Sequence, residues 1–91
     1  MLIVTERAKE ELRVVLSDSV DEPGLSLRLV SSGRGQFGLV PDVEKEGDQV
    51  VAHEGINVLL IDEEVSVVLE SAMIDCRETP EGPRLVLAKR T

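Results

Sequence analysis

The sequence predicts an α+β fold of mixed or antiparallel strands with one N-terminal helix and one shorter helix. Apolar residues recur at helical spacing in only two segments, one after residue 5 and one after residue 62. Alternation with a period of two, typical of strands, recurs in several other segments. Helices therefore do not alternate regularly with strands, as a doubly wound parallel sheet requires. With 91 residues, we expect a single compact domain spanning 1–91.

The N-terminal segment predicts a strand and then the longer helix. The short apolar run over residues 2–4 is typical of an edge strand, and Thr5 offers an N-cap hydroxyl to the helix that follows. We expect this helix to end near Asp18, before the turn-rich residues 21–24. Its apolar face consists of Ala8, Leu12, Val15 and Leu16.

The next segment predicts two strands around a glycine-rich loop. Leucines at 25, 27 and 29 alternate with Ser26 and Arg28, which indicates a strand buried on one face only. The loop spans residues 31–36. A second strand begins at Phe37 and continues to Val40, where Pro41 is expected to end it.

The rest of the chain predicts four more strands and the shorter helix. A charged turn at 44–47 precedes strands at 49–53 and 56–61, which meet at a Glu54-Gly55 turn. Asp62 can cap the shorter helix, and the apolar face of that helix contains Val65, Val68 and Leu69. A strand at 72–77, a tight turn at 79–83 and a last strand containing Leu85 and Leu87 complete the chain.

Composition and charge exclude several classes of partner. Ten basic and 18 acidic residues give a net charge of −8, which repels phosphate backbones and anionic membrane surfaces. No apolar run is long enough to span a bilayer, and charge appears at Glu6, too early for a signal peptide. We therefore expect a cytoplasmic protein with no nucleic-acid or membrane partner. Phe37 is the only aromatic residue, so the core must consist mainly of aliphatic side chains.

Several short motifs occur in a recognisable order over nearly the whole chain. A Thr-x-x-Ala helix start is followed by a Gly-Leu-x-Leu-Arg strand, a charged Gly-Asp turn, a Gly-x-x-Val strand that leads to Asp62, and a strand with a central Asp. They are Thr5-Glu6-Arg7-Ala8, Gly24-Leu25-Ser26-Leu27-Arg28, Gly47-Asp48, Gly55-Ile56-Asn57-Val58 and Ile74-Asp75. In this order they resemble the A-type iron–sulfur carrier (HesB/IscA-like) family. The resemblance implies a compact, β-rich HesB-like domain.

The sequence departs from that family at the cluster ligands. In the family, a cysteine in the glycine-rich loop and a Cys-Gly-Cys near the C-terminus supply thiolates, which are soft ligands suited to iron–sulfur clusters. Here Arg34 or Gly35 stands where the loop cysteine would fall, and the sequence closes at Thr91 without a Cys-Gly-Cys. An arginine has no lone pair to donate to a metal. None of the family's ligand positions carries over, and we expect no cofactor and no metal site.

Cys76 and His53 are the remaining candidate ligands. Strand alternation places Cys76 on the same face as Ala72 and Ile74, where a free cysteine acts as a small core hydrophobe. His53 has no second histidine at ligand spacing and is interpreted as a surface strand residue. The acidic residues 42–48 lack the spacing of an EF-hand and are interpreted as a solvated turn.

The glycine-rich loop is the candidate functional surface because it occupies the position that is active in the family. Arg34 could bind a carboxylate or phosphate with two hydrogen bonds, but the loop lacks the full phosphate-loop pattern, and an inert β-connection remains the alternative. Its residues are Ser31, Ser32, Gly33, Arg34, Gly35 and Gln36.

Two functional hypotheses follow. In the first, the chain is a non-catalytic binding or scaffold module that kept the fold and lost the cysteine site, with a protein partner and a homodimer both compatible. In the second, it is an iron or iron–sulfur cluster assembly or carrier protein that uses non-standard ligands such as Cys76, His53 or an external thiol. No nucleophile–base constellation is visible, so we do not expect an enzyme.

Overall fold

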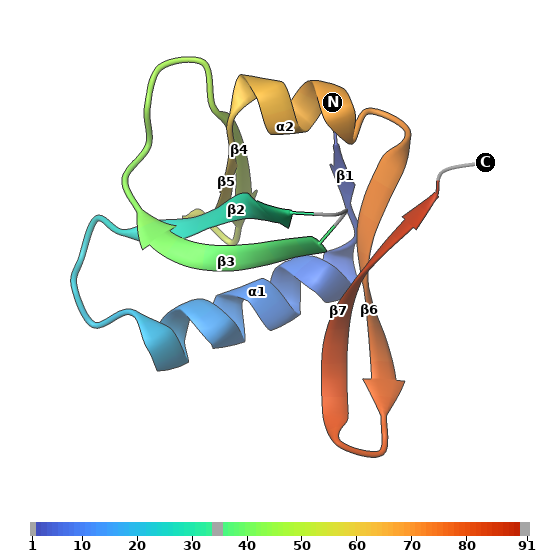
Figure 1. Ribbon diagram of the computed structural model, residues 1–91. Coiled ribbons are helices and arrows are strands. Elements are labelled where there is room, and N and C mark those ends of the chain that lie inside the picture. Colours follow the sequence, from blue (N-terminus) through green and yellow to red (C-terminus); the bar gives the residue numbers. More distant parts are fainter. Residues whose placement is uncertain (1, 34–35, 90–91) are drawn as a thin grey trace.

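The computed structural model describes residues 2–33 and 36–89 (Figure 1). These residues form two helices and seven strands. In chain order they are β1 (Ile3–Val4), α1 (Glu6–Ser19), β2 (Ser26–Gly33), β3 (Gln36–Asp42), β4 (Gln49–His53), β5 (Ile56–Ile61), α2 (Glu63–Val68), β6 (Ala72–Thr79) and β7 (Gly82–Lys89). The predicted α+β class, with one N-terminal helix and one shorter helix, is confirmed.

The strands form two mixed sheets. The four-stranded sheet has the order β3-β2-β5-β4, with β2 and β5 parallel and the outer pairs antiparallel. The three-stranded sheet has the order β1-β6-β7, in which β1 runs parallel to β6. Helix α1 packs against strands of both sheets and crosses beneath β2 and β3 in Figure 1. Neither described helix is long and apolar enough to cross a membrane.

The start of α1 is fixed to β6 by a threonine–aspartate pair. The Thr5 hydroxyl accepts a hydrogen bond from the Ala8 N–H (3.2 Å) and donates one to Oδ1 of Asp75 (2.8 Å). The N–H of Thr5 also donates to the carbonyl of Ile74 (3.0 Å). The hydrogen bond from Thr5, and then one from the N–H of Cys76, hold the pKa of Asp75 below its ordinary value. The predicted N-cap is therefore confirmed, and it also joins the helix to the sheet.

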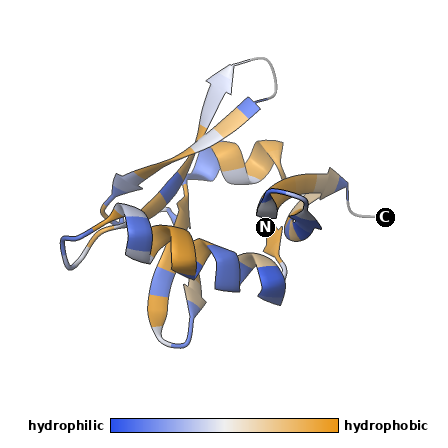
Figure 2. Cartoon of the chain, turned by 90° about the horizontal axis from the view of Figure 1, so that it is seen from below, coloured by the Kyte–Doolittle hydropathy of each residue, from blue (hydrophilic) through white to orange (hydrophobic). Residues whose placement is uncertain are grey.

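The core lies between α1 and the two sheets. Leu12 is fully buried, and every residue from Val58 to Ile61 in the inner strand β5 is fully buried. Figure 2 shows hydrophobic and hydrophilic residues alternating along α1, as expected for a helix that buries one face. Aliphatic side chains make up the buried apolar core together with Cys76, and Phe37 packs against its edge.

Two tight turns connect neighbouring antiparallel strands. His53 pairs with Ile56 across the Glu54-Gly55 turn, where both turn residues have positive φ (51° and 82°). This geometry belongs to the two-residue hairpin whose twist matches that of the strands, and glycine at the second position adopts it without strain. The predicted turn is therefore confirmed. In the β6–β7 hairpin only residues 80–81 lie outside the strands, so the turn predicted at 79–83 is shorter than expected.

Strand β2 differs from its prediction. The alternating leucines indicated a strand buried on one face, but Ser26 is only 8% exposed and Arg28 only 6%. Both faces of β2 are covered at this end of the strand. The Ser26 hydroxyl donates to the carbonyl of Asn57 (3.0 Å), which satisfies its hydrogen-bonding capacity.

The buried guanidinium of Arg28 is neutralised by two carboxylates. It donates to Asp48 through both Nη1 (2.9 Å) and Nη2 (2.7 Å), and to Asp42 through Nε (2.6 Å). Its Nη2 also donates to the carbonyl of Val43 (3.2 Å). Asp48, whose side chain is 2% exposed, also accepts from the N–H of Lys45 (2.7 Å). The arginine therefore fixes the turn between β3 and β4 against β2.

Three further predictions need correction. Pro41 does not end β3, which continues to Asp42; β3 is an edge strand, where a missing N–H is tolerated. Residues 31–33 and 36, predicted as loop, belong to β2 and β3 because that hairpin is longer than expected. Val68 was predicted to lie on the buried face of α2 but is 74% exposed, whereas Val65 and Leu69 do pack against the core.

Replacing Asp48 by Asn should destabilise the fold and reduce its acid sensitivity. Removing one partner of a buried ion pair costs roughly 3–5 kcal/mol. The hydrogen bonds from Arg28 hold the pKa of Asp48 below its ordinary value, so its contribution is fully present above the unfolded pKa of about 3.9. That contribution is lost as pH falls through the lower folded pKa. Urea unfolding followed by circular dichroism at pH 7 and at acid pH measures both effects.

The matched control is Asp21→Asn, because Asp21 is exposed. It should leave the free energy of unfolding within about 0.5 kcal/mol of wild type. An Asp48→Asn protein as stable as this control at pH 7 would contradict the proposed role of the Arg28 ion pair.

Candidate functional site

The predicted functional segment lies where β2 and β3 meet. Ser31, Ser32 and Gly33 are the last residues of β2, Gln36 is the first of β3, and all four are exposed. Gly33 pairs with Gln36 in the hairpin. Arg34 and Gly35 lie outside the described residues, so the predicted anion-binding role of Arg34 stays a prediction.

The described part of this segment offers only hydroxyl and amide groups. The Ser31 hydroxyl accepts a hydrogen bond from the N–H of Gly33 (3.4 Å), and Gly33 has a φ of +95°, which suits glycine. Hydroxyl and amide groups are weak ligands for iron compared with thiolates or imidazoles. Within residues 2–33 and 36–89, no group of three or more His, Cys, Asp or Glu side chains could hold a metal ion.

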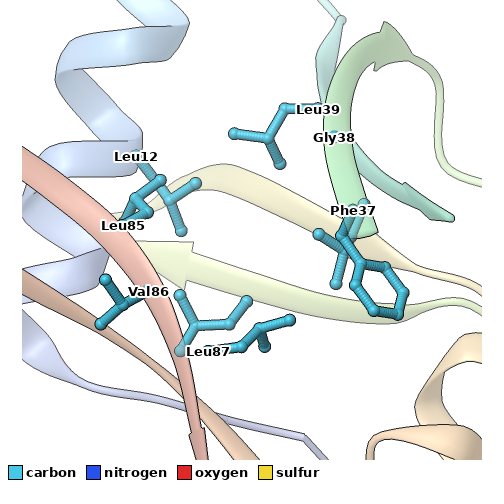
Figure 3. Close-up of a pocket in the computed structure, with 9 residues that line it drawn as sticks. Leu12, Phe37, Gly38, Leu39, Leu85, Val86 and Leu87 are labelled. Carbon is cyan, nitrogen blue, oxygen red and sulfur yellow. The ribbon is translucent and has the colours of Figure 1, made fainter. Parts of the chain in front are cut away.

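An apolar groove of about 360 Å³ opens between the two sheets beside this segment (Figure 3). Phe37 and Leu39 of β3 lie on one side of it, and Leu85 and Leu87 of β7 lie on the other. Every side chain that lines it is apolar. The complete lining is Leu12, Leu29, Phe37, Gly38, Leu39, Ile74, Leu85, Val86 and Leu87.

Cys76 is a core residue in the structure. It is 4% exposed, lies on β6 opposite Leu85 of β7, and belongs to the buried apolar cluster. Burial raises the pKa of its thiol, and the charge of Glu11 adds to this effect. Because the thiolate is the form that binds metals and attacks electrophiles, the environment disfavours both reactions. The interpretation of Cys76 as a small core hydrophobe agrees with this position.

His53 is less exposed than expected for a surface strand residue. Its side chain is only 14% exposed and lies between two carboxylates. Nδ1 is 3.8 Å from Oε2 of Glu6, and Nε2 is 3.9 Å from Oε1 of Glu54. Both glutamates are themselves highly exposed, so solvent screens their interaction with His53 and its energetic value is small.

Sequence reasoning missed the groove and the buried ion pairs. The groove residues come from α1, β2, β3, β6 and β7, and Leu39 and Leu85 on its opposite sides lie about 45 positions apart in the sequence. The one local signal for the ion pairs of Arg28 was the acidic stretch at residues 42–48, which the sequence analysis interpreted as a solvated turn. Asp48 in that turn is nearly inaccessible to solvent.

Solved structures with the same fold identify the architecture. The chain superposes on SufA of Escherichia coli, described as involved in the biosynthesis of iron–sulfur clusters, with a TM-score of 0.67 and 20% identity over 97% of this chain and 84% of SufA. It superposes on IscA with a [2Fe-2S] cluster with a TM-score of 0.60 and 20% identity, over 98% of this chain and 85% of IscA. A protein from Aquifex aeolicus, solved by NMR, gives a TM-score of 0.65 and 24% identity, over 97% and 90% of the two chains.

These likenesses show that the chain has the A-type iron–sulfur carrier fold, as the sequence resemblance implied. Neither a family model nor a curated protein sequence matches the chain. The fold is therefore established by the structure, whereas the residues of the site decide the chemistry.

Cys76 should react slowly with a thiol reagent in the native protein. A buried, protonated thiol reacts only when the structure opens, and we expect a rate roughly 100-fold below that of the urea-unfolded chain, as for an opening free energy of about 2.8 kcal/mol. Absorbance on addition of a disulfide reagent at pH 7 measures both rates.

The control for this prediction carries a cysteine at the exposed position 71 in a background without Cys76, made as Ser71→Cys with Cys76→Ser. That thiol should react in the native protein nearly as fast as in urea. A native Cys76 that reacts as fast as this control would show that the thiol is accessible, and would restore it as a candidate ligand.

Proposed function

We propose that this chain is a HesB/IscA-like domain that has lost the cysteine cluster site and acts as a non-catalytic binding or scaffold module. The proposal combines the fold with the chemistry of the segment at 31–36. Proteins of this fold include an iron–sulfur carrier with a bound cluster. In this chain the corresponding segment contains serine, glycine, arginine and glutamine in place of a thiolate donor.

The single observation that carries the proposal is the position of the only cysteine. Cluster binding takes four protein ligands, usually thiolates. The one thiol among these 91 residues is Cys76, which lies 4% exposed in the core with a raised pKa. Two copies of the chain would supply two such thiols, both inside their own cores.

The absence of a catalytic role forms part of the proposal. The single histidine, His53, has glutamates as its nearest charged neighbours and no hydroxyl or thiol nucleophile among its described polar contacts. General acid–base or nucleophilic catalysis requires such a pair within hydrogen-bonding distance. The net charge of −8 favours a protein partner over nucleic acid, and a homodimer is compatible with the fold. A single cysteine suits a reducing compartment, and we assign the protein to the cytoplasm.

The alternative function is iron or iron–sulfur handling through non-standard ligands. The observation that favours it is the superposition on cluster-loaded IscA over nearly the whole chain. Under this alternative the ligands come from His53, Cys76, acidic side chains or an external thiol such as glutathione.

Anaerobic reconstitution with ferrous iron and sulfide distinguishes the two functions. We expect no visible charge-transfer band and no iron retained after desalting, because the segment at 31–36 has no thiolate. Absorbance and iron content per chain are measured with and without added glutathione. Cluster-binding IscA, treated in parallel, is the positive control for the chemistry.

Stable iron at a fixed ratio to the chain, with a charge-transfer band, would replace the proposed function by the alternative. Cys76→Ser and His53→Ala would then identify the ligand, since only the variant that removes it should lose the band. Both variants are first checked for folding by circular dichroism, because both side chains are largely buried.

A further inference from the structure

Three surface depressions join into one path across the molecule. The first lies on α2 and the second between α2 and β3, and they share Glu64 and Val68. The second and the apolar groove between the sheets share Phe37. We call the whole surface the α2–β7 path. Besides the groove residues given above, its lining is Ser31, Glu63, Glu64, Val65, Val67 and Val68.

Apolar side chains are exposed at both ends of this path. Val67 is 65% exposed and Val68 is 74% exposed, and they are neighbours on a helix with no fully buried residue. At the other end Leu87 is 41% exposed. Figure 2 shows that α2 begins with hydrophilic residues and continues with hydrophobic ones. Contiguous exposed apolar side chains of this kind mark interaction surfaces more often than scattered single residues do.

Among the described residues, the charged side chains that line the path are carboxylates. Glu63 and Glu64 are exposed in the first turn of α2, and the Glu63 carboxylate lies beside Gly47 in the charged turn before β4. No lysine or arginine lines the three depressions within the described residues. An apolar occupant with cations at its α2 end therefore complements both the hydrocarbon lining and the carboxylates.

We propose that the α2–β7 path binds a short peptide segment of a partner protein, with apolar side chains that enter the groove and lysine or arginine residues that meet Glu63 and Glu64. This deepens the proposed function, on which it rests, by assigning the binding surface and the chemistry of its partner. The apolar residues supply most of the affinity, and the charge pair sets the direction in which the peptide lies.

The same observations disfavour two other occupants. A symmetric contact between two copies uses the same patch on both, and the described lining of that patch offers no lysine or arginine to pair with Glu63 and Glu64 of the other chain. A membrane surface with anionic lipids is repelled by the net charge of −8. A basic, apolar peptide meets neither obstacle.

The test is binding of a short fluorescein-labelled peptide of alternating leucines with lysines at one end, followed by fluorescence anisotropy. The matched peptide carries glutamates in place of the lysines. We expect the lysine peptide to bind at least roughly tenfold more tightly than the glutamate peptide, with a preference that shrinks as salt is raised. Equal affinity of the two peptides, or no binding of the lysine peptide, would overturn the proposal.

Variants on exposed positions locate the site without disturbing the core. Val68→Asp should weaken binding of the lysine peptide by roughly tenfold. Val14→Asp, at a valine that is 51% exposed on α1, should leave the affinity for this peptide unchanged. Glu64→Lys should reverse the preference towards the glutamate peptide, and Glu22→Lys, at an exposed position away from the path, should not. Equal effects of Val68→Asp and Val14→Asp would place the binding elsewhere.

Two further measurements decide between occupants. Sedimentation of the wild-type protein that shows a dimer abolished by Val68→Asp would assign the path to a second copy and overturn the peptide proposal. Binding to neutral phosphatidylcholine vesicles that Val68→Asp abolishes would do the same in favour of a lipid surface. We expect that the α2–β7 path forms no contact between two copies, so that Val68→Asp leaves the sedimentation unchanged. We also expect no binding to the vesicles.

Iron reconstitution is carried out on the same preparation, so that the two proposals fail separately. If the protein binds the peptide and also retains iron, the proposed peptide site stands and only the proposed loss of the cluster site is overturned. If the protein neither binds the peptide nor retains iron, the proposed peptide site is overturned. The proposed binding module without a cysteine cluster site then stands.

Discussion

The guanidinium of Arg28 lies inside the protein, and the order of the four-stranded sheet depends on how it is neutralised. An uncompensated charge in this position would cost several kcal/mol, so the two aspartates that bind it are obligatory partners. Asp48 supplies both of its carboxylate oxygens to the arginine, and one of them also accepts from the backbone of Lys45. Through these bonds one side chain determines the path of the chain from β3 to β4. Arg28 holds the pKa of Asp48 below its ordinary value, and the N–H of Val43, followed by Arg28, does the same for Asp42.

The second determinant is the way α1 connects two separate sheets. Thr5 caps the helix and binds Asp75 of β6, so the same hydroxyl begins the helix and orients the three-stranded sheet. Gln49 performs a similar task from the other sheet: its side-chain amide donates to the carbonyl of Leu2 (2.7 Å) and accepts from the Leu2 N–H (3.1 Å). The two sheets thus meet through polar side chains at one edge and through aliphatic packing around Leu12 at the centre. The apolar groove lies between β3 and β7, and no side-chain hydrogen bond joins these two strands among the residues that the structure describes.

Local features of the sequence predicted most of the elements, because their causes are local. The caps at Thr5 and Asp62 and the Glu54-Gly55 turn each depend on residues within three positions of one another. The burial of Arg28 could not be predicted in this way, because its partners lie 14 and 20 positions further along the chain. Helical spacing likewise placed Val68 on an apolar face, but whether a face is buried depends on what packs against it. For the candidate site, the family resemblance of the motifs pointed to residues 31–36, whereas the groove beside them exists only in the three-dimensional arrangement.

The pairing of β1 with β6 has a consequence for how the protein is made. Ile3 pairs with Met73 and Val4 with Ile74, so the first strand of the chain has no partner until the sixth has been synthesised. β6 in turn pairs along its whole length with β7, which extends to Lys89. On the ribosome, β1 and the part of α1 that packs against β6 and β7 therefore wait for almost the entire chain to emerge before they can be buried. Pairings between such distant segments fold slowly and leave apolar surface exposed in the meantime. We therefore expect a nascent chain of this protein to expose aliphatic side chains until β6 and β7 have been synthesised.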